Sequence, residues 1–400
     1  MKKILAFLLC FSMIIGCLAM TGCGRKDTVD PDKASELTIC MITDKNGLGD
    51  EGLNDSCLAG LEKAAEEYSS LTVEVVEPET DYAAAITEAV KKDPDIIICV
   101  SGDMGDVLTA VAPQYQDEVF IIFDAELPDQ FNVTTVKFNP EQQAYLAGAL
   151  AALYTKNNVA GFIADEENEL NVKYLYGFTG GVVSTNQKCY TTTNYIGAGN
   201  TARQAKETSV AQFKLGADVI FSALGNATRE GTLNAADERK FKVLSLSSAT
   251  NALHEGSVLA NVEKNGEAVC YEIASRIING TFDGSTIYFN MSGDAFTIKN
   301  PFNLINEDMM TVMEGIMAGL KDGTIIAPYD YSTYMTFISG GTFPTSDAEQ
   351  MAAQKAAIET IEAINAGKTA GADTATSGAA AAGTANAAEN AGGEATAPAQ

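Results

Sequence analysis

Short apolar runs alternate with helical stretches along the middle of the chain, and this alternation restricts the fold more than any other feature. The clearest runs are 95–100 and 119–124, which are almost entirely aliphatic or aromatic. Continuous runs of this kind are typical of strands in a parallel sheet that helices cover on both faces. The same reasoning predicts strands at 37–44, 71–76 and 133–138, helices at 53–68 and 82–92, and a further helix beginning at Pro140.

A second series of the same kind follows the first. It predicts strands at 158–164, 191–196, 218–224 and 241–246, and helices at 170–183, 201–215 and 229–239. Two such series indicate two doubly wound α/β lobes, which we assign to residues 37–150 and 151–260.

The predicted strand ends identify candidate binding residues. Right-handed crossovers bring the carboxyl ends of the strands in a lobe to one edge, where ligands bind in such folds. Asp44 and Asp124 offer carboxylate oxygens suited to vicinal hydroxyls or an amine, although a helix cap or a solvated loop acid is the alternative for each. The other candidates are small or hydrogen-bonding residues without a base–nucleophile pair, namely Gly102, Gly225, Asn226 and the segment from Ser245 to Ser248.

The first residues have the pattern of a lipoprotein signal. Lys2 and Lys3 precede an apolar stretch, 4–15, that is too short to span a membrane, and small residues lead into Cys23. We predict a signal peptide over 1–22, a lipid on Cys23 and a linker over 23–36, so that lipid would hold the protein to the membrane surface. Lipidation of Cys17, or an ordinary secretory signal, are the alternatives.

The last residues have a different composition. From about residue 366 to 400 the chain consists mainly of Ala, Gly, Thr, Asn and Glu, with no aliphatic side chain larger than Ala. Such a segment cannot bury enough apolar surface to offset its ordering entropy. We therefore predict a disordered tail beyond a last helix at 347–364, with an Ala-rich helix as the competing interpretation.

The composition excludes several classes of function. The 400 residues carry 53 Asp and Glu against 26 Lys and Arg, a formal charge of −27, whereas nucleic acid must be met by clustered basic residues. A single histidine, His254, argues against catalytic triads and histidine-rich zinc sites. The cysteines after residue 23 are scattered, odd in number and without CxxC spacing, which argues against a disulfide framework or a zinc ribbon. We expect no enzyme activity, no metal and no cofactor.

Several blocks between residues 37 and 285 follow one another in a distinctive order. They include Ile42-Thr-Asp44 with Gly49-Asp-Glu-Gly-Leu-Asn54, then Ile121-Ile-Phe-Asp124 with Ala144-Tyr-Leu-Ala-Gly148, then Gly216-Ala-Asp-Val-Ile-Phe221, and finally Val258-Leu followed by Lys264. In order and spacing these blocks resemble the basic membrane protein family. Its members are lipoprotein substrate-binding components of ABC importers, related to the purine nucleoside receptor of spirochaetes.

The resemblance implies a type I periplasmic-binding fold, in which two Rossmann-like lobes joined by hinge crossings close on the ligand. Residues 261–365 would then form the return to the first lobe, the hinge strands and the C-terminal helices. Asp44, Asn54 and Asp124 should face the ligand from the first lobe, and Lys264 should lie near the hinge. The expected partners are a nucleoside, permease and ATPase subunits and the membrane, and we expect a monomer.

Two departures from the family pattern affect the ligand. Leu53 stands where relatives have a phenylalanine, so one base-stacking ring is lost. Ser247 stands where relatives have a carboxylate that holds the ribose, and a serine offers fewer acceptor positions. The alternatives are therefore a divergent receptor for a non-nucleoside solute, or a surface sensor whose closure is read by a signalling partner.

Overall fold

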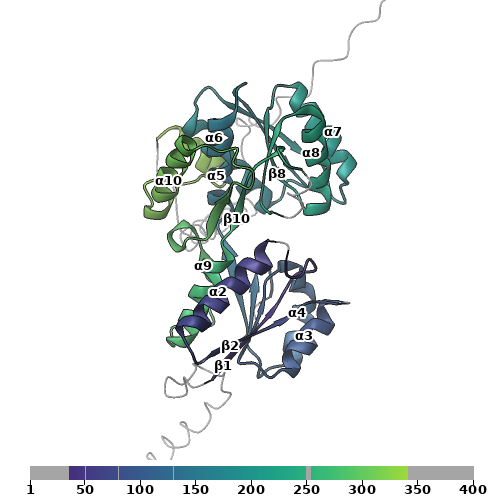
Figure 1. The fold of residues 1–400 in the computed structure, drawn as a ribbon, viewed down its shortest axis with the longest axis vertical. Helices are drawn as coiled ribbons and strands as arrows, with labels where there is room; N and C mark the ends of the chain where they lie inside the picture. Colours follow the sequence, from purple (N-terminus) through teal and green to yellow (C-terminus); the bar gives the residue numbers. More distant parts are fainter. Residues whose placement is uncertain (1–35, 50, 80, 129, 249–253, 341–400) are drawn as a thin grey trace, which may run out of the picture. The chain divides into compact units, whose positions relative to one another are not determined.

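The computed structural model describes residues 36–49, 51–79, 81–128, 130–248 and 254–340, and these residues form two six-stranded sheets (Figure 1). The first sheet has the order β2-β1-β3-β4-β5-β11 and is parallel throughout. Its strands are β1 (Leu37–Ile42), β2 (Leu71–Val76), β3 (Ile96–Cys99), β4 (Phe120–Phe123), β5 (Val133–Phe138) and β11 (Ile287–Phe289).

The second sheet repeats this arrangement. Its order is β7-β6-β8-β9-β10-β12, and only the β10–β12 pair is antiparallel. Its strands are β6 (Val159–Ala164), β7 (Tyr190–Tyr195), β8 (Val219–Ala223), β9 (Lys242–Ser245), β10 (Val258–Lys264) and β12 (Phe296–Lys299). The two predicted Rossmann-like lobes are thereby confirmed.

Helices cover both faces of each sheet (Figure 1). On the first sheet these are α2 (Leu53–Glu67) packed on α9 (Gly266–Ile278), and α3 (Tyr82–Lys91) packed on α4 (Gly105–Val111). On the second they are α5 (Pro140–Tyr154) packed on α6 (Glu169–Thr185), and α7 (Ala202–Lys214) packed on α8 (Asn226–Arg239). The last two helices among the described residues, α10 (Glu307–Asp322) and α11 (Tyr331–Ile338), pack on α5 and α6 respectively.

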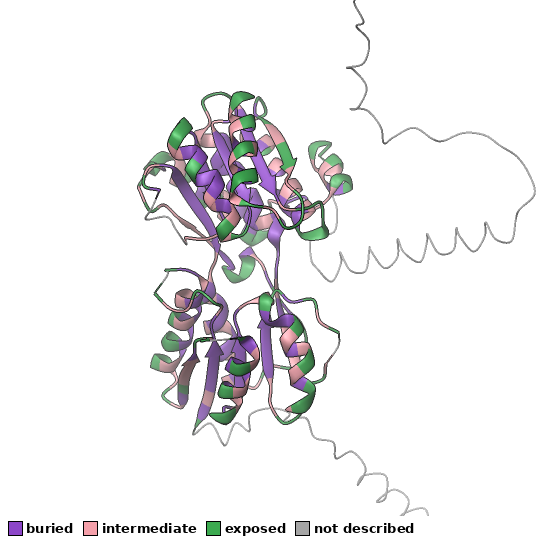
Figure 2. Cartoon of the chain, turned by 90° about the vertical axis from the view of Figure 1, so that its right-hand side faces the viewer, coloured by how far each residue is buried: buried purple, intermediate pink, exposed green. Residues whose placement is uncertain are grey.

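The central strands are the most deeply buried parts of both lobes (Figure 2). All residues of β3, β4, β6 and β8 are buried, as expected for parallel strands between two helix layers. In the second lobe, the Phe178 ring stacks on the Phe221 ring with centroids 5.3 Å apart. The helices α5 and α6 approach so closely that a Cβ on Gly148 would lie 2.0 Å from the carbonyl oxygen of Phe178.

In the part of the chain that the structure describes, the backbone passes between the two lobes three times, from β5 to α5, from β10 to α9 and from β11 to β12. Backbone hydrogen bonds join these crossings to one another. The Asn139 amide donates to the carbonyl oxygen of Phe289 over 3.2 Å, and the Asn265 amide donates to that of Ala295 over 2.8 Å. The three crossings therefore form one connected hinge.

The structure places some boundaries differently from the sequence prediction. Helix α5 was placed in the first lobe, within 37–150, but it packs on α6 and β10 and so belongs to the second. The segment 261–365 is not simply a return to the first lobe, because β12, α10 and α11 associate with the second. The predicted helix at 229–239 begins earlier, at Asn226.

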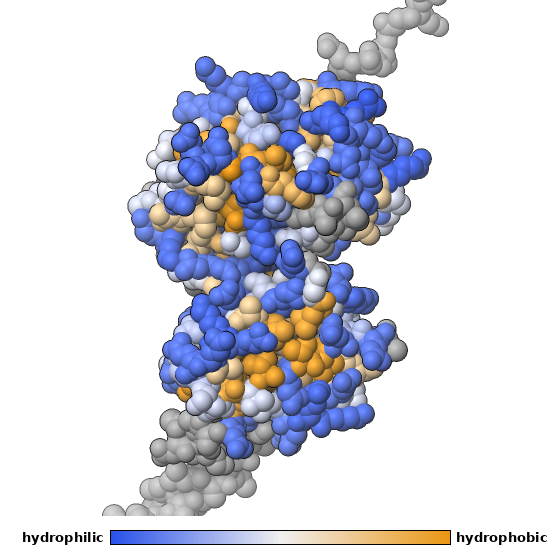
Figure 3. Space-filling view, in the orientation of Figure 1, coloured by the Kyte–Doolittle hydropathy of each residue, from blue (hydrophilic) through white to orange (hydrophobic). Residues whose placement is uncertain are grey.

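The predicted signal peptide, the lipidated Cys23, the last helix at 347–364 and the tail all lie outside the described residues. Within the described ranges, no helix is long and apolar enough to cross a membrane. Hydrophilic residues cover most of the face shown in Figure 3, as the excess of acidic residues predicts, and hydrophobic residues gather over the β1–β2 region of the first lobe.

Candidate functional site

The carboxyl edge of the first sheet carries three of the predicted residues. Asp44 follows β1, Gly102 follows β3 and Asp124 follows β4. The sheet order reverses between β1 and β3, and this switch point is where open α/β sheets bind ligands. A depression of about 450 Å³ lies here, lined by Lys45, Gly102, Asp103, Gly105, Asp106, Asp124, Ala125 and Glu126.

Asp44 and Asn54 hydrogen-bond each other at the start of α2. The Asn54 amide nitrogen donates to the Asp44 carboxylate over 2.6 Å, and the Asp44 backbone amide donates to Asn54 Oδ1 over 3.0 Å. Asn54 is buried and also donates to the Gly47 carbonyl oxygen, whereas Leu53 beside it is half-buried. Asn54 therefore fixes the loop that presents the Asp44 carboxylate.

Gly102 and Asp124 are fitted to each other through the backbone. A Cβ on Gly102 would lie 2.6 Å from the carbonyl oxygen of Asp124, a distance that side chains do not adopt. Asp124 itself has a φ of 54°, in the left-handed region that residues other than glycine seldom occupy. A conformation of this kind persists only where the surrounding structure holds it in place.

An ion pair joins the depression to the hinge. Lys264 is the last residue of β10, and its Nζ donates to the Asp124 carboxylate while lying 5.1 Å from the centroid of the Phe138 ring. The two side chains are 25% and 34% exposed, so the pair is only partly screened by solvent. Burial lowers the pKa of Lys264, but the Asp124 carboxylate opposes this and the net shift is upward, so Lys264 is charged.

Tyr174 on α6 belongs to the same environment, although the sequence analysis did not select it. Its ring is buried, and its hydroxyl lies 3.4 Å from Gln143 Oε1. Burial raises the pKa of Tyr174 to about 12; the Lys264 ammonium acts to lower this pKa and the Asp124 carboxylate acts to raise it. The only sequence signal for this tyrosine was its place in a helix, which does not reveal the face on which it lies.

The predicted residues of the second lobe lie at the carboxyl ends of β8 and β9. Gly225 precedes the first residue of α8, Asn226, and both are at least partly exposed. Ser247 follows β9, and its carbonyl oxygen accepts a hydrogen bond of 3.0 Å from the Ser245 hydroxyl. Next to it, the Ser248 hydroxyl donates to the buried carboxylate of Glu263, a residue that the sequence analysis also missed.

The structure therefore brings Gly102, Asp124 and Lys264 together and joins Asp44 to Asn54. Gly225, Asn226 and Ser247 occupy the matching edge of the second sheet. Carboxylate, amide, ammonium and hydroxyl groups of this kind can hold a polar ligand through directional hydrogen bonds.

Comparison with known proteins gives a family match over most of the chain. Residues 37–330 match the family described as ABC transporter substrate-binding protein PnrA-like. A CD4+ T-cell-stimulating antigen of Listeria innocua is 28% identical over 82% of this chain and 99% of its own length. The ABC transporter nucleoside-binding protein BmpA of Lactococcus lactis is 25% identical over 69% of this chain and 84% of its own length.

Solved structures show a similar fold at low sequence identity. An ABC transporter solute-binding protein from Aeropyrum pernix has a TM-score of 0.55 and 19% identity, over 76% of this chain and 96% of its own. A solute-binding protein of the same kind from Conexibacter woesei has a TM-score of 0.57 and 14% identity, over 73% of this chain and 99% of its own.

The predicted resemblance to the basic membrane proteins is confirmed by the family match over residues 37–330. A basic membrane protein A of Borreliella burgdorferi also matches, at 22% identity over 84% of this chain and 99% of its own length.

Proposed function

Because this chain belongs to the PnrA-like family of ABC transporter substrate-binding proteins, we propose that it is the lipid-anchored receptor of an importer and that its ligand is a nucleoside. The receptor would be held to the outer face of the cell membrane by a lipid on Cys23. A separate permease and ATPase would carry out transport. The name of the Lactococcus lactis relative, a nucleoside-binding protein, favours this class of ligand.

The observation that carries the proposal is the Asp124–Lys264 pair beside the depression of the first lobe. Asp124 projects from the carboxyl end of a central strand, where ligands of doubly wound sheets bind. Lys264 stands at a hinge crossing, so a ligand that contacts this pair also contacts the segment that moves when the lobes close. Asp44, held by Asn54, supplies a second carboxylate at the same edge.

The ligand would act by bridging the lobes. Contacts from Asp124 and Asp44 on one side, and from Asn226 and Ser247 on the other, are all made only when the lobes close, so the ligand stabilises the closed form. That closed form would dock on the permease. Since Ser247 offers a hydroxyl instead of a carboxylate, the sugar hydroxyls should be held less tightly from the second lobe.

A thermal-shift panel tests the proposal. A soluble chain that begins after Cys23 is melted with purine and pyrimidine nucleosides, free bases, sugars, amino acids and cationic amines, each in excess. Nucleosides should raise the melting temperature, because a ligand at one hundred times its dissociation constant adds about 2.7 kcal/mol to the unfolding free energy. A rise with another class alone would refute the nucleoside ligand, and no rise with any class would favour a sensor of a different signal.

A further inference from the structure

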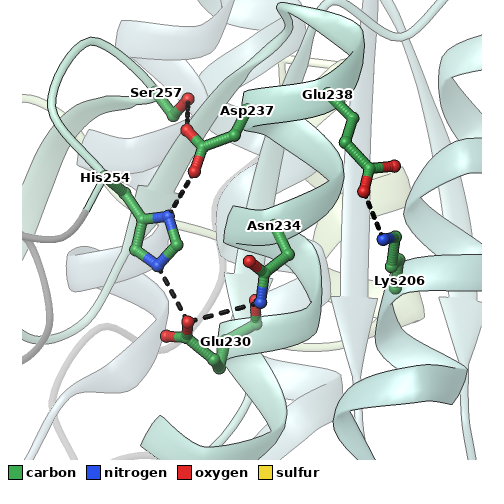
Figure 4. Close-up of polar contacts among 7 residues, drawn as sticks. All are labelled: Lys206, Glu230, Asn234, Asp237, Glu238, His254 and Ser257. Carbon is green, nitrogen blue, oxygen red and sulfur yellow. Dashed lines mark hydrogen bonds and ion pairs between the residues drawn. The ribbon is translucent and has the colours of Figure 1, made fainter.

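A chain of alternating charges runs through the second lobe, from the outer half of α8 to the end of β10. Figure 4 shows its first part, in which His254 lies between the carboxylates of Asp237 and Glu230. Arg229, next to Glu230 on α8, interacts electrostatically with both Glu230 and Glu263. Glu263 on β10 in turn accepts a hydrogen bond from Ser248, the neighbour of Ser247.

The geometry at His254 requires two N–H donors. Nδ1 lies 2.6 Å from an Asp237 carboxylate oxygen, and Nε2 lies 3.0 Å from one of Glu230. A neutral imidazole has one N–H and satisfies only one of these carboxylates, whereas an imidazolium satisfies both. The ring is 4% exposed, so little water is present to replace a lost hydrogen bond.

Burial makes the charge balance important. Arg229 is 1% exposed and Glu263 is 6% exposed, and the Nζ of Lys299 lies 3.4 Å from the Glu263 carboxylate. These carboxylates face cationic or hydrogen-bonding groups from several elements: Arg229 and Lys299 act on Glu263, and His254 and Lys240 act on Asp237. A buried network with one uncompensated charge is destabilised, because the charge is desolvated without a partner.

Burial also acts on the two groups at the ligand-side end of the chain. It lowers the pKa of Arg229 to about 10, an effect that Glu263 and Glu230 oppose. Burial raises the pKa of Glu263, and the Ser248 hydroxyl, Lys299 and Arg229 limit this rise by favouring the charged carboxylate. The Glu263 carboxylate and the Arg229 guanidinium therefore favour each other's charged form.

We propose that Glu263 is a positioning residue for the second-lobe half of the binding site, and that His254 supports it through Glu230 and Arg229. The ionised Glu263 carboxylate holds the Ser248 hydroxyl and so sets the position of Ser247 at the end of β9. His254 holds Glu230 and Asp237 through its two ring nitrogens, and so fixes the part of α8 that carries Arg229. The inference rests on the proposed ligand-binding function for its effect on affinity, but not for its effect on the network itself.

Several charged and polar groups surround His254 and its two carboxylate partners. Besides Glu230 and Asp237 they are the Ser257 hydroxyl on Asp237, Lys240 near Asp237, Lys242, which donates to the Gly256 carbonyl oxygen, and Glu255 in the adjoining turn. Neither lysine can replace the imidazolium, because neither has an ion pair with Glu230 among the contacts of the described residues. His254 thus remains the group that bridges the two α8 carboxylates.

The first test needs no ligand. Urea unfolding is measured at pH 6 for the wild type, Glu263→Gln, His254→Gln and the double variant. The midpoint losses of the single variants should exceed in sum the loss of the double variant, since removal of either end disrupts the same network. Glu238→Gln is the matched control, because Glu238 lies on α8 and forms a partly exposed ion pair with Lys206 (Figure 4). Its midpoint loss should add to that of Glu263→Gln and to that of His254→Gln. Full additivity of Glu263→Gln with His254→Gln would overturn the proposed coupling.

The second test measures the affinity for guanosine, or for the compound that raises the melting temperature most if that compound is not a nucleoside. Glu263→Gln should raise the dissociation constant about tenfold at pH 6, the effect of one lost charge-assisted hydrogen bond. His254→Gln should weaken binding in the same direction, because it removes the hydrogen bonds that hold Glu230 and Asp237 on α8. An unchanged dissociation constant in folded Glu263→Gln would refute the positioning role, and an unchanged one in folded His254→Gln would refute its support by His254. A wild type that binds no nucleoside but shows the urea coupling would refute only the proposed ligand.

Discussion

Gly102→Ala tests whether the backbone fit between the ends of β3 and β4 is required. The added Cβ would lie 2.6 Å from the Asp124 carbonyl oxygen and 3.1 Å from its carbonyl carbon. Both are backbone atoms, so relief requires a shift of the β4 end instead of a side-chain rotation. Overpacking of this kind costs about 1–3 kcal/mol of unfolding free energy, which lowers the melting temperature by roughly 2–5 °C in a folded unit of about 300 residues.

The chain provides a matched control at the equivalent position of the second lobe. Gly225 follows β8 as Gly102 follows β3, but a Cβ built on Gly225 meets nothing within 4 Å, and its φ of −59° suits alanine. Gly225→Ala should therefore leave the unfolding free energy within about 0.5 kcal/mol of the wild type.

Urea and thermal unfolding of the soluble chain measure both variants, and ligand affinity adds a second readout. Because the shift displaces Asp124, which carries the ion pair with Lys264, Gly102→Ala should also weaken binding. Equal stability of the two alanine variants would refute the argument from close approach. Loss of stability with unchanged affinity would show that the Asp124 carbonyl moves without its carboxylate.

Three further predictions concern the ligand, the pH and the thiols. Asp124→Ala should weaken ligand binding by about 2–4 kcal/mol in calorimetry, since a desolvated charge-assisted contact is lost, and unchanged affinity would remove this residue from the site. Burial alone would raise the pKa of Asp237, but hydrogen bonds from Ser257 and His254 outweigh burial, and the net shift is downward. The ionised Asp237 should therefore stabilise the fold near neutral pH, and this stabilisation should be lost as the pH falls through the lowered folded pKa. Acid unfolding of Asp237→Asn should accordingly show a weaker pH dependence. The five described cysteines are buried, and burial raises the pKa of Cys40 and Cys99 to about 12, so thiol reagents should modify the folded soluble chain slowly and the urea-unfolded chain quickly.

The sequence predicted the strands well because their chemistry is local. The run 95–100 is apolar on both faces, and the structure places a fully buried strand there. The edge that carries Asp44 and Asp124 followed from topology alone, since parallel strands with right-handed crossovers end on one side. Their contact with a ligand remains a prediction.

Other features could not be predicted because they depend on tertiary packing. Helix α5 is apolar on all sides, with Ala, Leu and Gly throughout, so its pattern did not show which lobe it packs against. Tyr174 and Glu263 become candidates only in the folded chain, where Lys264 acts electrostatically on Tyr174 and Ser248 donates a hydrogen bond to Glu263. The hinge position of Lys264 was implied by family resemblance, and the residues themselves did not indicate it.

The three crossings have a consequence for how the protein folds. Neither lobe is a continuous piece of chain, because the first lobe takes α9 and the edge strand β11 from residues that follow most of the second. During synthesis the first five strands must therefore wait, with the β5 edge unpaired, until a segment about 150 residues later has emerged. Pairing across such a separation closes a large loop and slows folding. The two lobes should accordingly fold interdependently, and the N-terminal strands alone should expose an edge prone to association.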